Sequence, residues 1–173
     1  YNDKLCKERL RVTKPERVYH LLWRSLAFKY LITTQYKVAE SRRELFAVFA
    51  NDSIGNFISI DGNFEREQLD LVNDFVESLP WDAKDKTCCD IGANIGVHAR
   101  YFAEIFSQVH AFEAHPRVYK LLEFNTETIN NITHYQIGLG SKISSMKLSS
   151  NQHNLGGSSF RYDQGSGVYY DVN

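Results

Sequence analysis

The sequence predicts an α/β protein built on a doubly wound parallel sheet. Three observations predict this fold. Strand-like and helix-like segments alternate after residue 86, the first strand runs into a glycine turn, and an acid stands at the end of each of the first two strands. Strand–helix–strand units with right-handed crossovers produce a parallel sheet. The 173 residues suffice for one ordinary domain, or for a domain with an N-terminal extension.

Residues 1–80 are predicted to form a helical and β-hairpin extension. Pro15 can open a helix, because apolar residues recur at helical spacing from Val18 to Ile32. A further helix is expected over about 65–79, where apolar residues again recur at helical spacing. Pro80 would close it.

The hairpin is predicted between these two helices. Two apolar runs, 45–50 and 56–60, flank a stretch rich in Asn, Asp and Gly at 51–55. Two apolar runs around such turn residues are the pattern of a β-hairpin.

Residues 81–173 are predicted to hold the ligand-binding part of the protein. The expected elements are a strand ending at Asp90, a helix over about 95–106, a strand over 109–113, a helix opened by Pro116 and a strand over 134–137. Residues 138–173 have the pattern of strands or loops and not of helices. The parallel sheet is therefore expected to stop after its third strand.

The most informative segment is the turn between the first strand and its helix. It reads Asp90-Ile91-Gly92-Ala93-Asn94-Ile95-Gly96. Two glycines four residues apart allow a sharp turn and let a ligand approach the backbone. The following helix offers unpaired N–H groups and a partial positive charge at its N-terminus. Strand, turn and helix together are typical of a nucleotide-type ligand site.

The residues around this turn favour one ligand. A dinucleotide fingerprint needs a middle glycine, and Asn94 occupies that position. Asp90 suits a ligand ammonium group, held directly or through water. Glu113, at the tip of the second strand, can accept hydrogen bonds from both hydroxyls of a ribose, each worth roughly 1.5–3 kcal/mol. An amino-acid tail and a ribose together describe S-adenosylmethionine.

The predicted cofactor-binding residues follow from this interpretation, and no metal site is expected. They are Asp90, Gly92, Ala93, Asn94, Gly96 and Glu113.

Two motifs resemble those of the FkbM family of S-adenosylmethionine-dependent methyltransferases. They are Cys89-Asp90-Ile91-Gly92-Ala93-Asn94-Ile95-Gly96 and Ala111-Phe112-Glu113-Ala114-His115-Pro116. The family typically carries DIGANIG and then FEP, whereas here Ala114 follows the acid and Pro116 comes two residues later. Three less specific segments are similar to family features, and the resemblance covers roughly 45–173. They are Gly62-Asn63-Phe64-Glu65, Asn125 and Asn154-Leu155-Gly156-Gly157-Ser158-Ser159.

The resemblance implies a Rossmann-like methyltransferase fold and an O-methyltransferase that acts on a hydroxyl of a sugar or natural product. The family usually continues into a K-x-D-x-E-G segment on a fourth strand, which this sequence does not contain. We therefore expect the cofactor-binding half of the domain, with a small-molecule or glycan acceptor and no assigned catalytic residue. An unpaired strand edge is also expected, through which copies could associate.

Alternatives to this interpretation remain at the level of sequence. His98 and His115 lie near the predicted site, but a satisfied or surface histidine is favoured for each, and neither is assigned as a base. A nucleotide-binding oxidoreductase of the NAD type is disfavoured by the missing glycine. A non-catalytic Rossmann-like interaction module also remains open.

The distribution of charge and the cysteine content limit which partners and which compartment the sequence predicts. Residues 1–43 hold eleven Lys and Arg against four Asp and Glu, a net charge of +7 within a chain of net charge −1. Such an arm could contact nucleic acid, a membrane surface or an acidic partner, but the scattered charges favour a solvated helix face. No nucleic acid and no membrane span are expected. Three cysteines, two of them adjacent on a strand expected to be buried, favour a reducing cytoplasmic compartment.

Overall fold

The computed structural model describes residues 15–42, 46–50, 52–62, 64–151, 154–160 and 168–172. The α/β fold class is confirmed. A three-stranded parallel sheet has the order β1-β2-β3 and is joined by two helices. Its elements are β1 (Thr87–Ile91), α5 (Val97–Ile105), β2 (Gln108–Phe112), α6 (Pro116–Thr126) and β3 (Ile132–Tyr135). The basic residues before position 15 lie outside the described residues, and so does Cys6.

Both crossover helices cover one face of this sheet. The core on that face joins strand residues such as Val109 and Ala111 to Ala99 of α5 and Leu122 of α6. Two successive right-handed crossovers that advance in the same direction place their helices on the same side. Within the described residues the chain therefore winds in one direction, from β1 to β3, and the helices of a second winding on the other face are not seen among them.

The other face of the sheet is open. Ile91 is 66% exposed there, and Cys89 is exposed as well. The rings of Phe112 and Tyr135 stack on this face, with centroids 4.7 Å apart. The expectation that β1 is buried is therefore wrong for alternate residues. Side chains of a strand alternate between faces, and only Cys88 and Asp90 point toward the helices.

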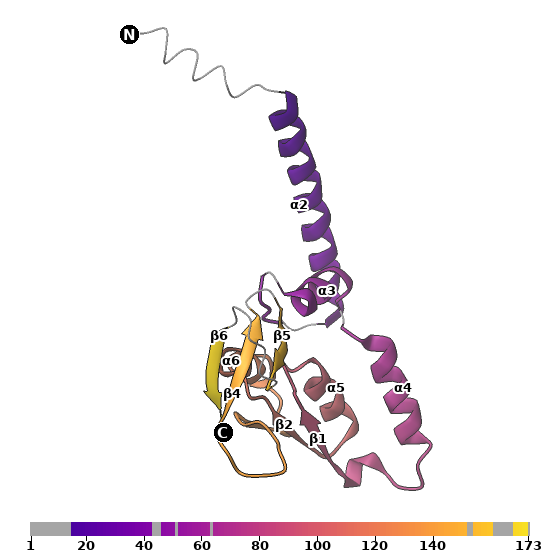
Figure 1. The fold of residues 1–173 in the computed structure, drawn as a ribbon. Helices are drawn as coiled ribbons and strands as arrows, with labels where there is room; N and C mark the ends of the chain where they lie inside the picture. Colours follow the sequence, from indigo (N-terminus) through magenta and orange to yellow (C-terminus); the bar gives the residue numbers. More distant parts are fainter. Residues whose placement is uncertain are drawn as a thin grey trace.

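The two helices expected in the N-terminal region are present. They are α2 (Pro15–Arg42) and α4 (Arg66–Glu77). Figure 1 shows α2 extending away from the sheet and its helices. Ile32 is half-buried and lies near the end of α2 that packs on α3, whereas residues 18–31 of the same helix are exposed.

The predicted β-hairpin is wrong, because its second strand is a helix. Residues Ser53–Asp61 form α3, and the residues read as a turn are its N-terminal cap. The Asp52 carboxylate accepts a hydrogen bond from the Ile54 N–H, and Gly62 closes the helix with a φ of 72°. Buried Ile58 joins a cluster with Ile95 and Val118, so tertiary packing overrides the strand-like pattern.

Asn125 fixes the segment before α3 to the centre of the fold. Its side-chain oxygen accepts from the Ala47 N–H at 2.7 Å. Its nitrogen donates to the carbonyls of Ala47 and Ile95, at 3.0 and 2.8 Å. The side chain is 2% exposed, so these bonds replace all of its contacts with water. This explains why a polar residue stands on the inner side of α6.

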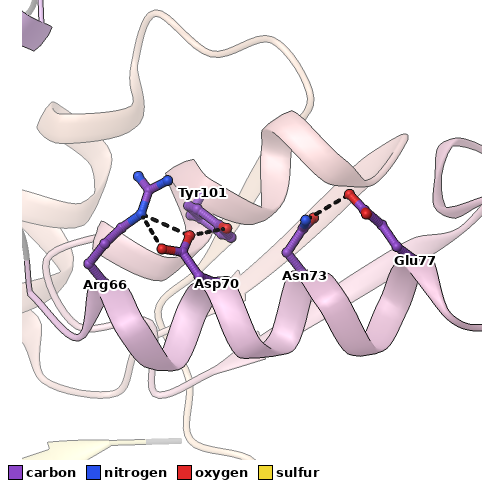
Figure 2. Close-up of polar contacts among 5 residues, drawn as sticks. All are labelled: Arg66, Asp70, Asn73, Glu77 and Tyr101. Atoms are coloured by element: carbon purple, nitrogen blue, oxygen red, sulfur yellow. Dashed lines mark hydrogen bonds and ion pairs between the residues drawn. The ribbon is translucent and has the colours of Figure 1, made fainter.

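A surface cluster joins α4 to α5 (Figure 2). Asp70 accepts hydrogen bonds from Arg66 Nε at 2.9 Å and from the Tyr101 hydroxyl at 3.0 Å. The bonds from Arg66 and then Tyr101 hold the pKa of Asp70 below its ordinary value. The Arg66 guanidinium also lies 5.2 Å from the centre of the Tyr101 ring. These contacts set the position of the N-terminal end of α4 beside α5.

Residues after β3 form a second, antiparallel sheet of order β5-β4-β6. Among the described residues of this region, strands and loops are present and no helix, as the sequence predicted. Its strands are β4 (Met146–Asn151), β5 (Asn154–Ser159) and β6 (Val168–Val172). Leu148 and Val172 pack against Ala114, which directly follows β2 and Glu113. The second sheet therefore borders the carboxyl end of the parallel sheet.

Candidate functional site

The turn between β1 and α5 is held by backbone hydrogen bonds to the end of β2. The N–H groups of Gly92 and Ala93 both donate to the carbonyl of Phe112, at 2.9 Å each. The Gly96 N–H donates to the carbonyl of Ala93 at 2.9 Å. The turn needs residues that accept a positive φ, and it has them at Gly92, Asn94 and Gly96. Asn tolerates this conformation better than most residues.

The carboxylate of Glu113 joins the ends of the two strands. Its Oε2 accepts from the Asn94 N–H at 3.0 Å, and its Oε1 accepts from the His115 N–H at 2.7 Å. Burial raises the pKa of Glu113, and these backbone N–H groups act in the opposite direction. Each carboxylate oxygen can accept a second hydrogen bond, so Glu113 keeps capacity for a ligand.

Asp90 has a different environment. It is 8% exposed, and its Oδ2 has no hydrogen-bond partner in the structure. Burial raises the pKa of Asp90, with the charge of His98 and the backbone N–H of Ala99, in the first turn of α5, opposing it. A buried carboxylate oxygen without a partner is costly, and a ligand cation would relieve that cost.

Two cavities adjoin the turn, and both are lined by Gly92 and Asn94. The first, of about 220 Å³, is bounded by Glu113, Ile137, Leu139 and Phe160, among others. The second, of about 250 Å³, lies on the α4 and α5 side and is bounded by residues that include Phe64, Glu65, Ala93 and His98. An elongated ligand can therefore cross the turn with one end in each cavity.

Glu65 and His98 meet at the second cavity. Glu65 Oε2 lies 3.1 Å from His98 Nε2, which allows an ion pair when the imidazole is protonated. The two atoms are not aligned as a hydrogen bond, since His98 Nε2 has no such partner. Glu65 also has a φ of 55°, an uncommon conformation for a residue other than glycine. Uncommon backbone conformations of this kind cluster at functional sites.

The predicted cofactor-binding residues occupy different places around the turn. Gly92, Asn94 and Glu113 line the first cavity, and Ala93 lines the second. Asp90 and Gly96 are not among the lining residues of either cavity.

The two glycines of the turn serve different purposes. A Cβ on Gly92 would meet no atom within 4 Å, so this position leaves open space beside the cavities. A Cβ on Gly96 would lie 3.0 Å from side-chain atoms of Leu122 and Thr126 in α6. Gly96 therefore permits close packing between the turn and α6, in addition to its φ of 94°.

Sequence reasoning missed part of the first cavity. Phe160 packs over Gly138, where an added Cβ would lie 2.7 Å from the ring. Both residues line the cavity, together with Ser158. Nothing in the local pattern pairs positions 138 and 160, because they meet only through the second sheet.

His115 is a structural residue. It is 1% exposed, and its Nδ1 accepts hydrogen bonds from the N–H groups of Arg117 and Val118 at the start of α6. Burial lowers the pKa of His115, which keeps Nδ1 free of a proton and able to accept. The expectation that His115 is a satisfied histidine is confirmed.

No family model matches the chain, and no curated protein matches it. Among solved structures, the chain is similar to the 23S rRNA methyltransferase ErmE, with 22% identity over 43% of this chain and 29% of that one, at a TM-score of 0.37. It is also similar to a putative caffeoyl-CoA O-methyltransferase from Staphylococcus aureus, with 20% identity, 64% and 50% coverage and a TM-score of 0.38.

A third similar structure is coclaurine N-methyltransferase bound to N-methylheliamine and SAH, with 15% identity, 83% and 50% coverage and a TM-score of 0.39. The chain spans 29–50% of the length of these three proteins. With TM-scores below 0.4, we draw no conclusion about activity from these similarities.

Proposed function

We propose that this chain binds S-adenosylmethionine and belongs to a methyltransferase. The observation that carries the proposal is the pair of cavities on either side of one glycine turn, each with carboxylates at or near it. The residues fit the cofactor: a buried carboxylate oxygen of Asp90 lacks a partner, and Gly92 leaves room for a ligand against the backbone. When bound, the cofactor supplies an electrophilic methyl group on a sulfonium.

In the proposed arrangement, the nucleoside lies in the first cavity. Glu113 accepts hydrogen bonds from the ribose hydroxyls through the lone pairs that its backbone contacts leave free. The apolar side chains of Ile137, Leu139 and Phe160 offer a surface for the adenine. Such a site combines an apolar lining with a few placed polar groups, which is typical of ligand pockets.

The amino-acid tail then lies in the second cavity. Its ammonium group pairs with Asp90, directly or through one water, and its carboxylate lies near His98 and the N-terminus of α5. The N-cap of α5 is Gly96, which has no side chain to satisfy the first N–H groups of the helix. In this arrangement the ammonium group lies toward Asp90, which is beside the cavity and not among its lining residues, and the carboxylate lies toward the N-terminus of α5.

The geometry of the turn disfavours an NAD-type ligand. In a dinucleotide site the middle glycine lets the backbone approach the pyrophosphate. Here that position is Asn94, and its N–H already donates to Glu113. An acidic group that occupies this N–H would repel a pyrophosphate rather than bind it.

The resemblance to the FkbM family extends the proposal to the acceptor. It indicates transfer to a hydroxyl of a sugar or natural product. The cysteines separately favour a reducing, cytoplasmic compartment. In such a transfer the protein positions acceptor and donor and excludes water. Among the described residues that line the two cavities, we assign none as the general base of the transfer.

Isothermal titration of the full chain with S-adenosylhomocysteine and with NAD tests the proposal. We expect saturable binding of S-adenosylhomocysteine and none of NAD. A matched titration with 5′-methylthioadenosine, which lacks the amino-acid tail, separates the two cavities. Tight NAD binding with no response to S-adenosylhomocysteine would overturn the proposal.

A further inference from the structure

The helix α2 exposes many large apolar side chains. Successive residues of an α-helix are about 100° apart around its axis, and seven of these side chains fall within an arc of about 140°. They are Val18, Tyr19, Leu22, Trp23, Leu26, Tyr30 and Tyr36. Each is at least 44% exposed, and Trp23 is 70% exposed. We name this set the apolar arc. Three further exposed apolar side chains lie outside it, namely Leu21, Phe28 and Leu31, so the apolar residues are concentrated on this side of the helix without being confined to it. An apolar face of this width is typical of a helix that lies against another surface.

We propose that the apolar arc of α2 binds the surface of a membrane that contains anionic lipids. Charge is the first argument. Residues 1–43, which include α2, carry a net charge of +7. Basic segments are attracted to anionic leaflets by about 1 kcal/mol for each Lys or Arg near the surface. Lys29 and Lys37 are exposed on α2 within the apolar arc and are available for such contacts.

The composition of the arc is the second argument. Tyr19, Trp23 and Tyr30 each combine an apolar ring with a polar tip, a combination enriched where a membrane meets water. Lys29 lies around the helix between Val18 and Leu22, and its long stem can reach past the apolar residues to the lipid headgroups.

A second copy of this chain fits the arc less well. A coiled-coil seam needs apolar residues at a spacing of 3.5 over three or more heptads, and the arc from Val18 to Tyr36 spans fewer than three. Two helices that each belong to a segment of charge +7 would also repel each other. An anionic surface removes that repulsion.

The geometry indicates a helix that lies on the membrane. Among the described residues, no helix combines the length and the apolar character that crossing a bilayer requires. The helix extends from the rest of the fold (Figure 1), so the arc can reach a flat surface. This inference is independent of the proposed cofactor site.

Vesicle flotation of the full chain tests the inference. The vesicles are phosphatidylcholine alone, or phosphatidylcholine with about a third phosphatidylserine. We expect flotation with the anionic vesicles, weakening as salt is added, and little with the neutral ones. In a Trp81→Phe background, the fluorescence of Trp23 should shift to shorter wavelength on binding. Equal flotation with both vesicles, or none with either, would overturn the proposal.

A pair of matched variants tests the arc itself. Leu26→Glu lies on the arc, whereas Leu21→Glu lies on the far side of the same helix, and both leucines are more than half exposed. Both variants add the same charge, so only position differs. We expect Leu26→Glu to weaken vesicle binding about tenfold or more relative to Leu21→Glu. Circular dichroism confirms that both keep the helix.

Sedimentation velocity tests whether the apolar arc binds a second copy of this chain instead of a membrane. We expect a monomer in the absence of vesicles. A dimer that Leu26→Glu dissociates would show that the arc binds a second copy, and it would overturn the proposal. Equal effects of Leu21→Glu and Leu26→Glu on flotation would also overturn it, because the arc would then have no special role.

Discussion

The ends of β1 and β2 each carry a buried or half-buried carboxylate, and the fold uses the two groups differently. Both oxygens of Glu113 accept backbone hydrogen bonds, from Asn94 and from His115. Asp90 has an oxygen, Oδ2, that is buried without a hydrogen-bond partner. Glu113 therefore contributes to the shape of the turn even without a ligand. Asp90 is the group whose environment a ligand would improve.

The largest expected effect belongs to Glu113→Ala, which should reduce both stability and binding. The N–H groups of Asn94 and His115 would lose their acceptor, at a cost of about 2 kcal/mol in the free energy of unfolding. Losing the ribose hydrogen bonds should weaken the binding of S-adenosylhomocysteine about 100-fold. Chemical denaturation and calorimetric titration measure the two effects.

Glu113→Gln is the control for this prediction. It keeps an oxygen that can accept from the backbone, so the loss of stability should be smaller than in Glu113→Ala. Its affinity for the ligand should still fall. If both variants bind as tightly as the wild type, Glu113 does not bind the ribose.

The two glycines of the turn, like the two carboxylates, should differ in how much each contributes to the stability of the fold. Gly96→Ala should cost about 3 kcal/mol of unfolding free energy, because strain at positive φ adds to contact with Leu122 and Thr126. Gly92→Ala should cost only about 1 kcal/mol, from its positive φ alone. Urea denaturation of both variants measures the difference.

Binding should separate the two glycines in the opposite order. Gly92 borders both cavities, so a methyl group there should weaken S-adenosylhomocysteine more than one at Gly96 does, once both variants are fully folded. A larger loss of affinity in Gly96→Ala would mean that the ligand does not cross the turn at Gly92.

The sequence predicted the parts of this site that depend on local spacing. The glycine turn, the acid two residues before Gly92 and the helix opened by Pro116 are each specified by neighbouring residues. The helix α3 was missed because its residues were interpreted as turn residues followed by an apolar run, whereas the cap of Asp52 and packing on Ile95 decide its structure. The contacts of Phe160 with Gly138 and of Glu65 with His98 join distant segments, so no local pattern contains them.

Asp90→Asn should have an effect on binding alone. Loss of the charge that pairs with the ligand ammonium should weaken S-adenosylhomocysteine about tenfold or more. The unfolding free energy should stay the same or rise, since burial disfavours the charged form of Asp90. The affinity for 5′-methylthioadenosine should not change. An equal loss for both ligands would place Asp90 outside the tail site.

The smallest effect should appear in the pH dependence, where binding and stability respond to Asp90 with opposite signs. Burial raises the pKa of Asp90 above its ordinary value of 3.8, so between these two values the native state binds more protons than the unfolded state. The contribution of Asp90 to the stability of the free protein is therefore present below 3.8 and is lost as pH rises through the raised pKa.

Binding of an ammonium needs the ionised carboxylate, so affinity for S-adenosylhomocysteine should instead rise with pH over that window. Titrations and thermal unfolding across the acid range measure both slopes, with Asp90→Asn as the matched control. The control should lose the part of each slope that Asp90 causes, and the dependence that arises from other groups, such as Glu113 and Asp70, should remain. If the wild type and Asp90→Asn show the same binding slope, the tail of the ligand does not pair with Asp90, and other groups account for the response to pH.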